Sequence, residues 1–235
     1  NANRQHRRIR LFEVGKTFHG GEGVTEHERV SGVVTGSGWP EQWGQREREV
    51  DFFDLKSDVE GLFSLTRATA GEVRFERLET HPALHPGQAA LIRSHSGVIG
   101  KMGRLHPKHQ RALELPAAVY LFEIELPAVV TRTMPEYHGI SRFPAIRRDL
   151  AVWVGEDVPA GEMLDAITKS AGETLVNLEL FDVYRREDVD SKRKSLAFGL
   201  TLQASSPTLT DSDVDSIGDR TLRELHDLYG AELRT

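Results

Sequence analysis

The sequence of 235 residues contains no cysteine, which excludes disulfide bonds, thiolate metal sites and a cysteine nucleophile and fits a reducing compartment. It has no run of about 18 apolar residues, so no segment is expected to span a membrane. The first residues lack the cationic, apolar and small-residue pattern of a secretory signal. An excess of positive charge is missing too. The net charge of −6, from 30 Lys and Arg against 36 Asp and Glu, argues against nucleic-acid binding through bulk charge alone.

The composition predicts a folded protein of one large or two ordinary domains. Hydrophobic residues make up 38% of the sequence, enough for a full core and too many for a disordered tail. Residues 136–235 hold 12 basic and 19 acidic side chains, so RNA binding there would require a local basic patch of specific shape. The chain begins with Asn1-Ala2 rather than Met. This start is typical of a cleaved expression tag, and we expect a piece of a longer protein.

The first part of the sequence predicts mostly antiparallel β structure with one or two helices. Apolar spacing indicates a helix over residues 51–65 with Asp51 as its N-cap, and a second, short helix beginning near His106. Two prolines predict a rigid loop over residues 81–87. Residues 131–139 have no periodic apolar face and are expected to link two domains, 1–135 and 136–235. Strands are expected at residues 9–18, 30–35, 71–78, 89–95, 97–105 and 118–126.

The second part predicts the order β-α-β-β-α-β, which is the ferredoxin-like split βαβ motif. Strands are expected at residues 149–154, 174–184, 194–203 and 232–234, and helices at residues 159–171 and 210–229. In the third strand, large apolar side chains alternate with Ser195, Ala197, Gly199 and Thr201. Both helices of such a fold pack on one face of the sheet, so the small polar face is expected to remain open.

An open sheet face with aromatic side chains is typical of modules that stack single-stranded RNA bases. Alternation in the first strand places Trp153 on this face, and Phe181 and Tyr184 are further aromatic candidates. The alternative, that the linker or the first domain covers these rings, is equally compatible with the spacing. Two basic groups are candidates for phosphate contacts: Arg142, Arg147 and Arg148 before the first strand, and Arg185, Arg186, Lys192, Arg193 and Lys194 around the hairpin loop.

The sequence offers little support for metal binding, for a phosphate or dinucleotide site, or for hydrolysis. His81 and His85 are four apart, but prolines exclude a shared helical face, and no His-Glu-x-x-His pattern occurs, so we expect no metal site. The glycine-rich run 97–104 lacks the ending of a phosphate loop and the context of a dinucleotide fold. Glycines of a β-hairpin are the favoured interpretation. No Gly-x-Ser-x-Gly elbow is present, so a hydrolase triad is not expected.

Several segments resemble the β subunit of bacterial phenylalanyl-tRNA synthetases, in order and over nearly the whole chain. Residues 141–151 (SRFPAIRRDLA), 179–184 (ELFDVY), 194–197 (KSLA), 208–211 (TLTD) and 231–234 (AELR) resemble its anticodon-binding domain. Upstream, residues 10–15 (RLFEVG), 51–56 (DFFDLK), 85–90 (HPGQAA) and 100–107 (GKMGRLHP) resemble the preceding module of that subunit.

The resemblance implies an α+β protein. Residues 1–135 would form an antiparallel, class II synthetase-like sheet domain without catalytic activity, and residues 136–235 a ferredoxin-fold anticodon-binding domain. The implied partners are the α subunit, in a cytoplasmic heterotetramer of two α and two β subunits, and the anticodon stem-loop of phenylalanine tRNA. ATP and Mg²⁺ would serve the holoenzyme, with no cofactor in this chain. Editing and magnesium sites would lie upstream, so no catalytic or metal residue is carried over.

The candidates for RNA contact combine both lines of reasoning. Arg147 and Arg148 are the first choices in the family motif, where Asp149 would fix a local turn. Asp182 and Tyr184 would contact RNA or hold the hairpin. The small residues of the third strand would let bases approach the backbone. The full set is Arg142, Arg147, Arg148, Trp153, Asp182, Tyr184, Ser195 and Ala197.

Two alternatives to RNA binding remain at this point. The second domain would be a ferredoxin-like regulatory module that binds a small ligand or dimerises through its sheet, or the chain would be a separate enzyme that uses its loop histidines. Because much of the tRNA-binding surface would lie in the rest of the subunit, we expect this part alone to be inactive and to bind tRNA weakly.

Overall fold

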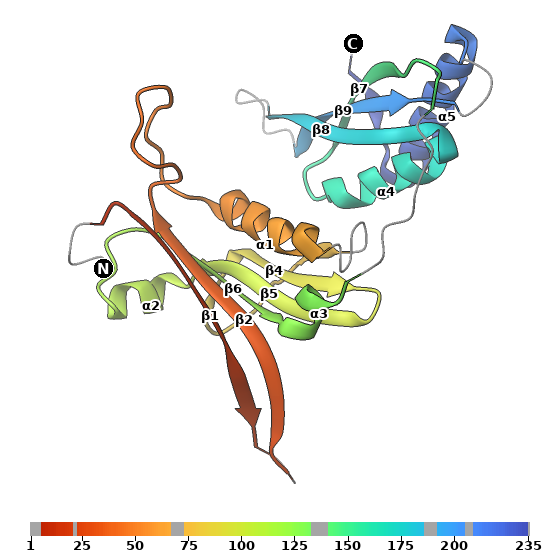
Figure 1. Cartoon of the computed structure of the whole chain (residues 1–235). Helices are drawn as coiled ribbons and strands as arrows, with labels where there is room; N and C mark the ends of the chain where they lie inside the picture. Colours follow the sequence, from red (N-terminus) through yellow and green to blue (C-terminus); the bar gives the residue numbers. More distant parts are fainter. Residues whose placement is uncertain are drawn as a thin grey trace. The chain divides into compact units, whose positions relative to one another are not determined.

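A computed structural model describes residues 6–20, 23–66, 73–132, 141–185, 192–204 and 209–234. The chain divides into two compact units, Asn1–Pro135 and Glu136–Thr235, shown in Figure 1. Residues 133–140, which hold most of the expected linker, the loop at 186–191 with Arg186, and Asn1-Ala2 lie outside the described residues. No helix in the described ranges combines the length and apolarity required to cross a membrane.

The first unit is built on a six-stranded antiparallel sheet with the strand order β1-β2-β6-β5-β4-β3. Its strands are β1 (Arg8–His19), β2 (Thr25–Gly36), β3 (Arg74–Arg77), β4 (Leu84–Ser94), β5 (Gly97–Leu105) and β6 (Val119–Glu125). Its helices are α1 (Phe52–Thr66), α2 (Pro107–Ala112) and α3 (Leu126–Val130). The expected antiparallel β class is therefore confirmed for this unit.

Helix α1 covers one face of this sheet because its apolar side chains recur at helical spacing. Leu55, Val59 and Phe63 are buried against sheet residues that include Met102 and Ile124. Asp51 caps the helix as predicted, since its carboxylate accepts hydrogen bonds from the backbone N–H groups of the residues two and three positions on, at 2.8 and 3.0 Å.

Three local features differ from or refine the sequence expectations. Strand β4 begins inside the expected rigid loop, and a register shift between Leu84 and Ala89 accommodates Pro86. Helix α3, which starts with a proline in its first turn, was not predicted. The glycine run is a hairpin, as expected: a Cβ on Gly103 would lie 2.6 Å from a backbone oxygen, so the close strand approach requires glycine.

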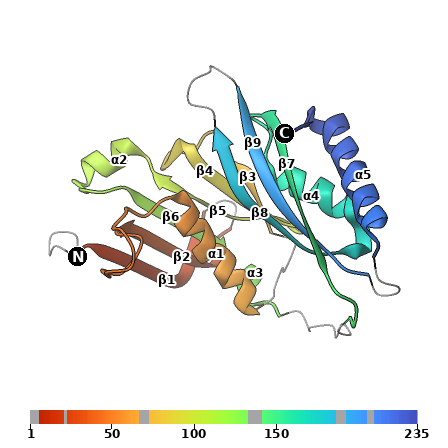
Figure 2. The same ribbon diagram turned by 90° about the horizontal axis from the view of Figure 1, so that it is seen from above.

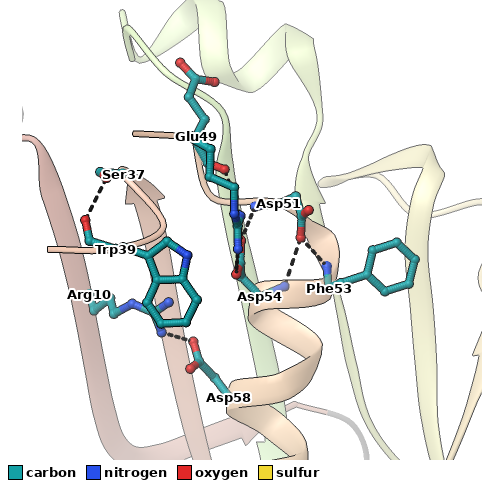
Figure 3. A network of polar contacts seen from close by, with 9 residues as sticks. Arg10, Ser37, Trp39, Glu49, Asp51, Phe53, Asp54 and Asp58 are labelled. Atoms are coloured by element: carbon teal, nitrogen blue, oxygen red, sulfur yellow. Dashed lines mark hydrogen bonds and ion pairs between the residues drawn. The ribbon is translucent and has the colours of Figure 1, made fainter. Parts of the chain in front are cut away.

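Asp54 links the start of α1 to the preceding loop, as Figure 3 shows. Its carboxylate accepts two hydrogen bonds from Arg48 at 2.6 and 2.7 Å and one from the backbone N–H of Asp51 at 2.8 Å. These hydrogen bonds, those from Arg48 first, lower the pKa of the Asp54 carboxyl below its usual 3.8. On the same helix, Asp58 pairs with Arg10 of β1.

We expect Asp54→Asn to lower the free energy of unfolding by about 1–2 kcal/mol at pH 7, because a neutral amide cannot accept the paired donors of Arg48. A carboxyl whose pKa is lower in the folded state stabilises the fold above its unfolded pKa, and this contribution disappears as pH falls through the folded value. Urea unfolding of wild type and variant should therefore converge below pH 3.8. Glu60→Gln, which removes an exposed pair with Lys56, is the control and should change little.

The second unit has a four-stranded antiparallel sheet with the order β10-β7-β9-β8. Helices α4 and α5 lie together on one face of it (Figures 1 and 2). The strands are β7 (Ile146–Gly155), β8 (Leu175–Arg185), β9 (Arg193–Leu202) and β10 (Glu232–Leu233). The helices are α4 (Ala160–Ala171), a 3-10 turn η2 (Gly172–Thr174) and α5 (Asp211–Tyr229). The element order confirms the predicted ferredoxin-like fold.

The core of the second unit follows the predicted periodicity. In β9, Leu196, Phe198, Leu200 and Leu202 are buried against the helices. Thr210 and Asp213 form a capping box at the start of α5. Val214, Ile217 and Leu225 of α5 are buried, whereas Leu228, near the end of the helix, is mostly exposed.

Strand β7 begins three residues earlier than expected. Arg147 and Arg148 therefore lie within the strand rather than before it. Asp149 also lies in β7, so it does not fix a turn as predicted. Its carboxylate accepts a hydrogen bond from Nε of Arg147 at 3.0 Å.

Candidate nucleic-acid interface

The face of the second sheet opposite α4 and α5, hereafter the open face, gathers side chains from all four strands. Strand register decides its membership, because residues directly opposite each other on neighbouring strands share a face. Trp153 and Tyr184 both lie opposite Ser195, and Asp182 lies opposite Ala197. The open face comprises Arg147, Asp149, Ala151, Trp153, Asn177, Glu179, Phe181, Asp182, Tyr184, Arg193, Ser195, Ala197, Gly199, Thr201, Glu232 and Arg234.

One cluster on the open face is centred on Arg234, which follows β10. Its guanidinium carbon lies 5.0 Å from the ring centre of Tyr184 and 5.9 Å from that of Trp153, and the two rings meet edge to face at 6.0 Å. The guanidinium also lies 4.0 Å from the carboxylate of Asp182. The backbone N–H of Arg234 donates to the carbonyl of Ala151 at 2.8 Å, which holds the residue in place.

A second cluster on the open face joins Arg147 and Phe181. The guanidinium carbon of Arg147 lies 5.6 Å from the ring centre of Phe181. It also crosses Gly199, where a Cβ would lie 2.7 Å from the guanidinium. A register shift between Leu180 and Asp182 makes Phe181 an extra residue in β8. Without that bulge, Phe181 and Tyr184, three positions apart, would point to opposite faces.

The small residues of β9 lie beneath these clusters. Ser195 is 1% exposed and Ala197 is 6% exposed. The Oγ of Ser195 accepts a long hydrogen bond of 3.4 Å from Arg234. The expected direct approach of bases to Ser195 and Ala197 is therefore not available in this arrangement, because the long side chains of neighbouring strands cover the floor of the sheet. A contact to Ser195 requires Arg234 to move.

Strand pairing places the predicted Arg148 on the opposite face, and Arg142 lies outside the strands. Arg148 lies opposite Leu200, on the helix side, and donates to Asp215 of α5 at 2.9 Å. Arg142 is exposed and precedes β7. Strand alternation explains the separation of Arg148 from Arg147, since consecutive residues of a strand point to opposite faces.

The described basic residues at the hairpin end mostly bind acceptors of the same unit. Arg185 donates to Glu156 at 2.8 Å, and Arg193 donates to Glu232 at 2.8 Å. Lys194 is buried and donates to the carbonyl of Glu156 at 2.8 Å. Burial lowers the pKa of the Lys194 ammonium. These contacts favour a structural role for this group over phosphate binding.

Sequence reasoning missed Arg234. The signal was available in the predicted topology: in a ferredoxin-like sheet the last strand pairs beside the first, so a residue next to β10 lies close to Trp153. The hydrogen bond from the backbone N–H of Arg234 to Ala151 then holds its side chain beside the aromatic pair.

The histidines singled out in the sequence have local roles. Nδ1 of His81 accepts a hydrogen bond from the N–H of Ala83, and Nδ1 of His85 accepts one from the N–H of Gly87. Within the residues that the structure describes, no group of three His, Asp or Glu side chains is placed to hold a metal ion.

Comparisons with known proteins agree in both units. The family model "Phenylalanyl tRNA synthetase beta chain CLM domain" matches residues 1–126, and the model "Ferredoxin-fold anticodon binding domain" matches residues 141–234. The chain is 43% identical over 235 residues to the phenylalanine–tRNA ligase beta subunit of Methylococcus capsulatus and 44% identical to that of Pseudomonas fluorescens. Identity to the corresponding subunit of Coxiella burnetii is 43% over 236 residues.

These matches cover 100% of this chain and 29–30% of the relatives, of which it corresponds to the C-terminal part. The two family models match one unit each, and together they cover nearly the whole chain. The chain therefore belongs to the phenylalanyl-tRNA synthetase β-chain family, and its second unit is a ferredoxin-fold anticodon-binding domain.

Proposed function

We propose that this chain is a non-catalytic part of the β subunit of phenylalanine–tRNA ligase, and that its open face binds the anticodon region of phenylalanine tRNA during aminoacylation. The observation that carries the proposal is the pair of arginine–aromatic clusters within the domain matched by the anticodon-binding family. The domain limits that we propose for these roles are 1–135 and 136–235.

The open face offers each kind of contact that single-stranded RNA requires. Trp153, Phe181 and Tyr184 supply rings on which bases stack. Arg147 and Arg234 supply charge for phosphates. Asp182 carries a carboxylate that accepts hydrogen bonds from base amino groups. Ser195 and Ala197 form the floor that lets these side chains lie flat on the sheet.

The face nevertheless carries no excess of positive charge, because Arg147 pairs with Asp149, Arg193 pairs with Glu232, Arg234 lies beside Asp182, and Glu179 adds a further carboxylate. Stacking and hydrogen bonding should therefore supply most of the anticodon-dependent affinity. If only the two arginines contact phosphates, we expect log affinity to fall with log salt at a slope of about −1.4 for this contribution. The difference in salt dependence between wild type and a double variant, Arg147→Gln with Arg234→Gln, measures it.

The first unit would support the α subunit in an assembly of two α and two β subunits. ATP and Mg²⁺ would be used by that holoenzyme. The support for this proposal is the match of residues 1–126 to the β-chain family model and the identity of 43–44% to phenylalanine–tRNA ligase beta subunits. We assign no cofactor to this chain, and we propose that the holoenzyme acts in the cytoplasm.

Neighbouring arginines on opposite faces of β7 provide the test of this function. In the holoenzyme, we expect Arg147→Gln to lower kcat/KM for charging phenylalanine tRNA by about 5- to 10-fold, since it removes one phosphate contact and one cation–π contact. Arg148→Gln loses the same charge but only a surface ion pair with Asp215, and should leave kcat/KM nearly unchanged.

A tRNA with a changed anticodon completes the experiment. The wild-type holoenzyme should prefer the native anticodon, and substitutions on the open face should reduce that preference. Equal effects of Arg147→Gln and Arg148→Gln, or a preference unchanged by substitutions on the open face, would contradict the proposal. Self-association of the subunit through this face would favour the dimerisation alternative.

A further inference from the structure

The first unit exposes an unpaired and apolar sheet edge. Strand β1 pairs with β2 along all twelve residues from Arg8 to His19 without a register shift, and its opposite edge pairs with no strand in the described part of the chain. Figure 1 shows this β1–β2 hairpin extending well beyond the other strands of the sheet. A long free edge of this kind presents backbone N–H and C=O groups to any available strand.

The two edge strands of the sheet differ in length and in the kind of side chains that they expose. Strand β3, at the other edge, has only four residues, three of which are Arg74, Glu76 and Arg77. Short, charged edge strands prevent further pairing. Strand β1 has twelve residues, and Leu11, Phe12, Val14 and Phe18 along it are all more than half exposed.

Three of these exposed side chains, Phe12, Val14 and Phe18, lie on the face that carries α1, whereas Leu11 lies on the other face. Lys16 separates Val14 from Phe18 on that face, and Phe12 is 80% exposed. Helix α1 packs on β5 and β6 and reaches β1 through the pair of Asp58 with Arg10. The apolar stripe beyond this pair has no cover among the described residues, whereas Val30 and Val34 of β2 and Ile124 of β6 on the same face are buried.

We propose that this edge is an interaction surface for a strand from the preceding part of the same β subunit, which pairs with β1 and covers the Phe12–Val14–Phe18 stripe. This inference rests on the family, not on the proposed RNA binding. The relatives contain more than twice as many residues before the matched part as within it. All contacts between neighbouring strands of this sheet except β2–β6 join strands consecutive in sequence, so the place beside β1 is the expected position of the strand before it.

The charges of this face argue against RNA as its occupant. RNA would require positive charge, but Arg10 is paired with Asp58 and Lys16 is paired with Glu26. A second copy of the chain, or the α subunit, would also bury the stripe. The possible occupants differ in the condition under which the β1 amides become protected from hydrogen exchange.

Hydrogen exchange in the full-length β subunit tests the proposal. We expect the β1 amides that do not bond to β2 to exchange at least about 100-fold more slowly than unprotected amides, in the isolated full-length subunit and at every protein concentration. Protection that appears only when the α subunit is added, or only as concentration rises, would overturn the proposal in favour of those partners. Fast exchange under all conditions would show that no strand pairs there.

A matched pair of substitutions separates the stripe from general exposure. Phe12→Glu should remove the protection of the free β1 edge in the full-length subunit, because it places a charge under the added segment. Phe53→Glu alters a phenylalanine of similar exposure that lies beside β3 and β4, and should leave the protection intact. Loss of protection in both variants, or in neither, would contradict the assignment.

Discussion

Replacing Phe198 by alanine should lower the free energy of unfolding of the second unit by about 3–5 kcal/mol. Phe198 lies in the middle of β9, is fully buried, and has strand partners Leu150 and Leu180 on either side. Its ring is part of the core beneath α4 and α5. Total domain stabilities are about 5–15 kcal/mol, so this loss would remove a large part of the stability.

Hydrogen exchange of the β9 amides measures this loss within the intact subunit, because these central amides report the opening of the unit. Leu228→Ala on α5 is the matched control. Leu228 is 56% exposed, and we expect its truncation to cost below about 1 kcal/mol. If the two substitutions accelerated β9 exchange equally, the assignment of the core face of β9 would be wrong.

The second fold could be predicted because its signals are local and periodic. Alternation in β9 identifies its buried face, and the capping box at Thr210 marks the start of α5. These patterns depend on residues within one strand or one helical turn. The glycines of β5 could likewise be predicted as hairpin residues, because the sequence around them lacks the features of a phosphate loop. The close approach of the neighbouring strand at Gly103 explains why glycine is required there.

The parts that could not be predicted depend on pairing between strands. β7 starts at Ile146 because its first residues pair with the end of β9, a contact not visible in the local sequence of β7. Once β7 includes Arg147 and Arg148, alternation separates them onto opposite faces. The bulge that brings Phe181 to the open face is likewise a property of the β8–β9 ladder.

The buried floor of the open face illustrates the same limit. Small residues in β9 were expected to admit bases, but Ser195 is covered by the side chain of Arg234, the residue that follows β10. Small residues leave space above the sheet, and side chains from the neighbouring strands determine whether that space is occupied. Burial of Ser195 and Ala197 therefore follows from the packing of β10 beside β7.

Arg234 is the substitution with the largest expected effect on the proposed RNA binding. We expect Arg234→Gln to lower kcat/KM for phenylalanine tRNA in the holoenzyme by about 5- to 30-fold, or about 1–2 kcal/mol. The guanidinium contacts both aromatic rings and lies beside Asp182, so its removal takes away a cation and the support of the stacking platform. Arg234→Lys retains the charge but loses the planar stacking and should fall between wild type and Arg234→Gln.

A double-mutant cycle distinguishes support of the platform from charge alone. Tyr184→Leu should by itself cost about 1–3 kcal/mol of stacking, and Arg234→Gln should cost less in that background than in wild type, by at least about 0.5 kcal/mol. The effect of Arg147→Gln should instead add to that of Tyr184→Leu, because Arg147 belongs to the other cluster. Tighter tRNA binding by Arg234→Gln would reverse the assignment: Arg234 would then be a side chain that blocks access to Ser195 and must leave before a base can enter.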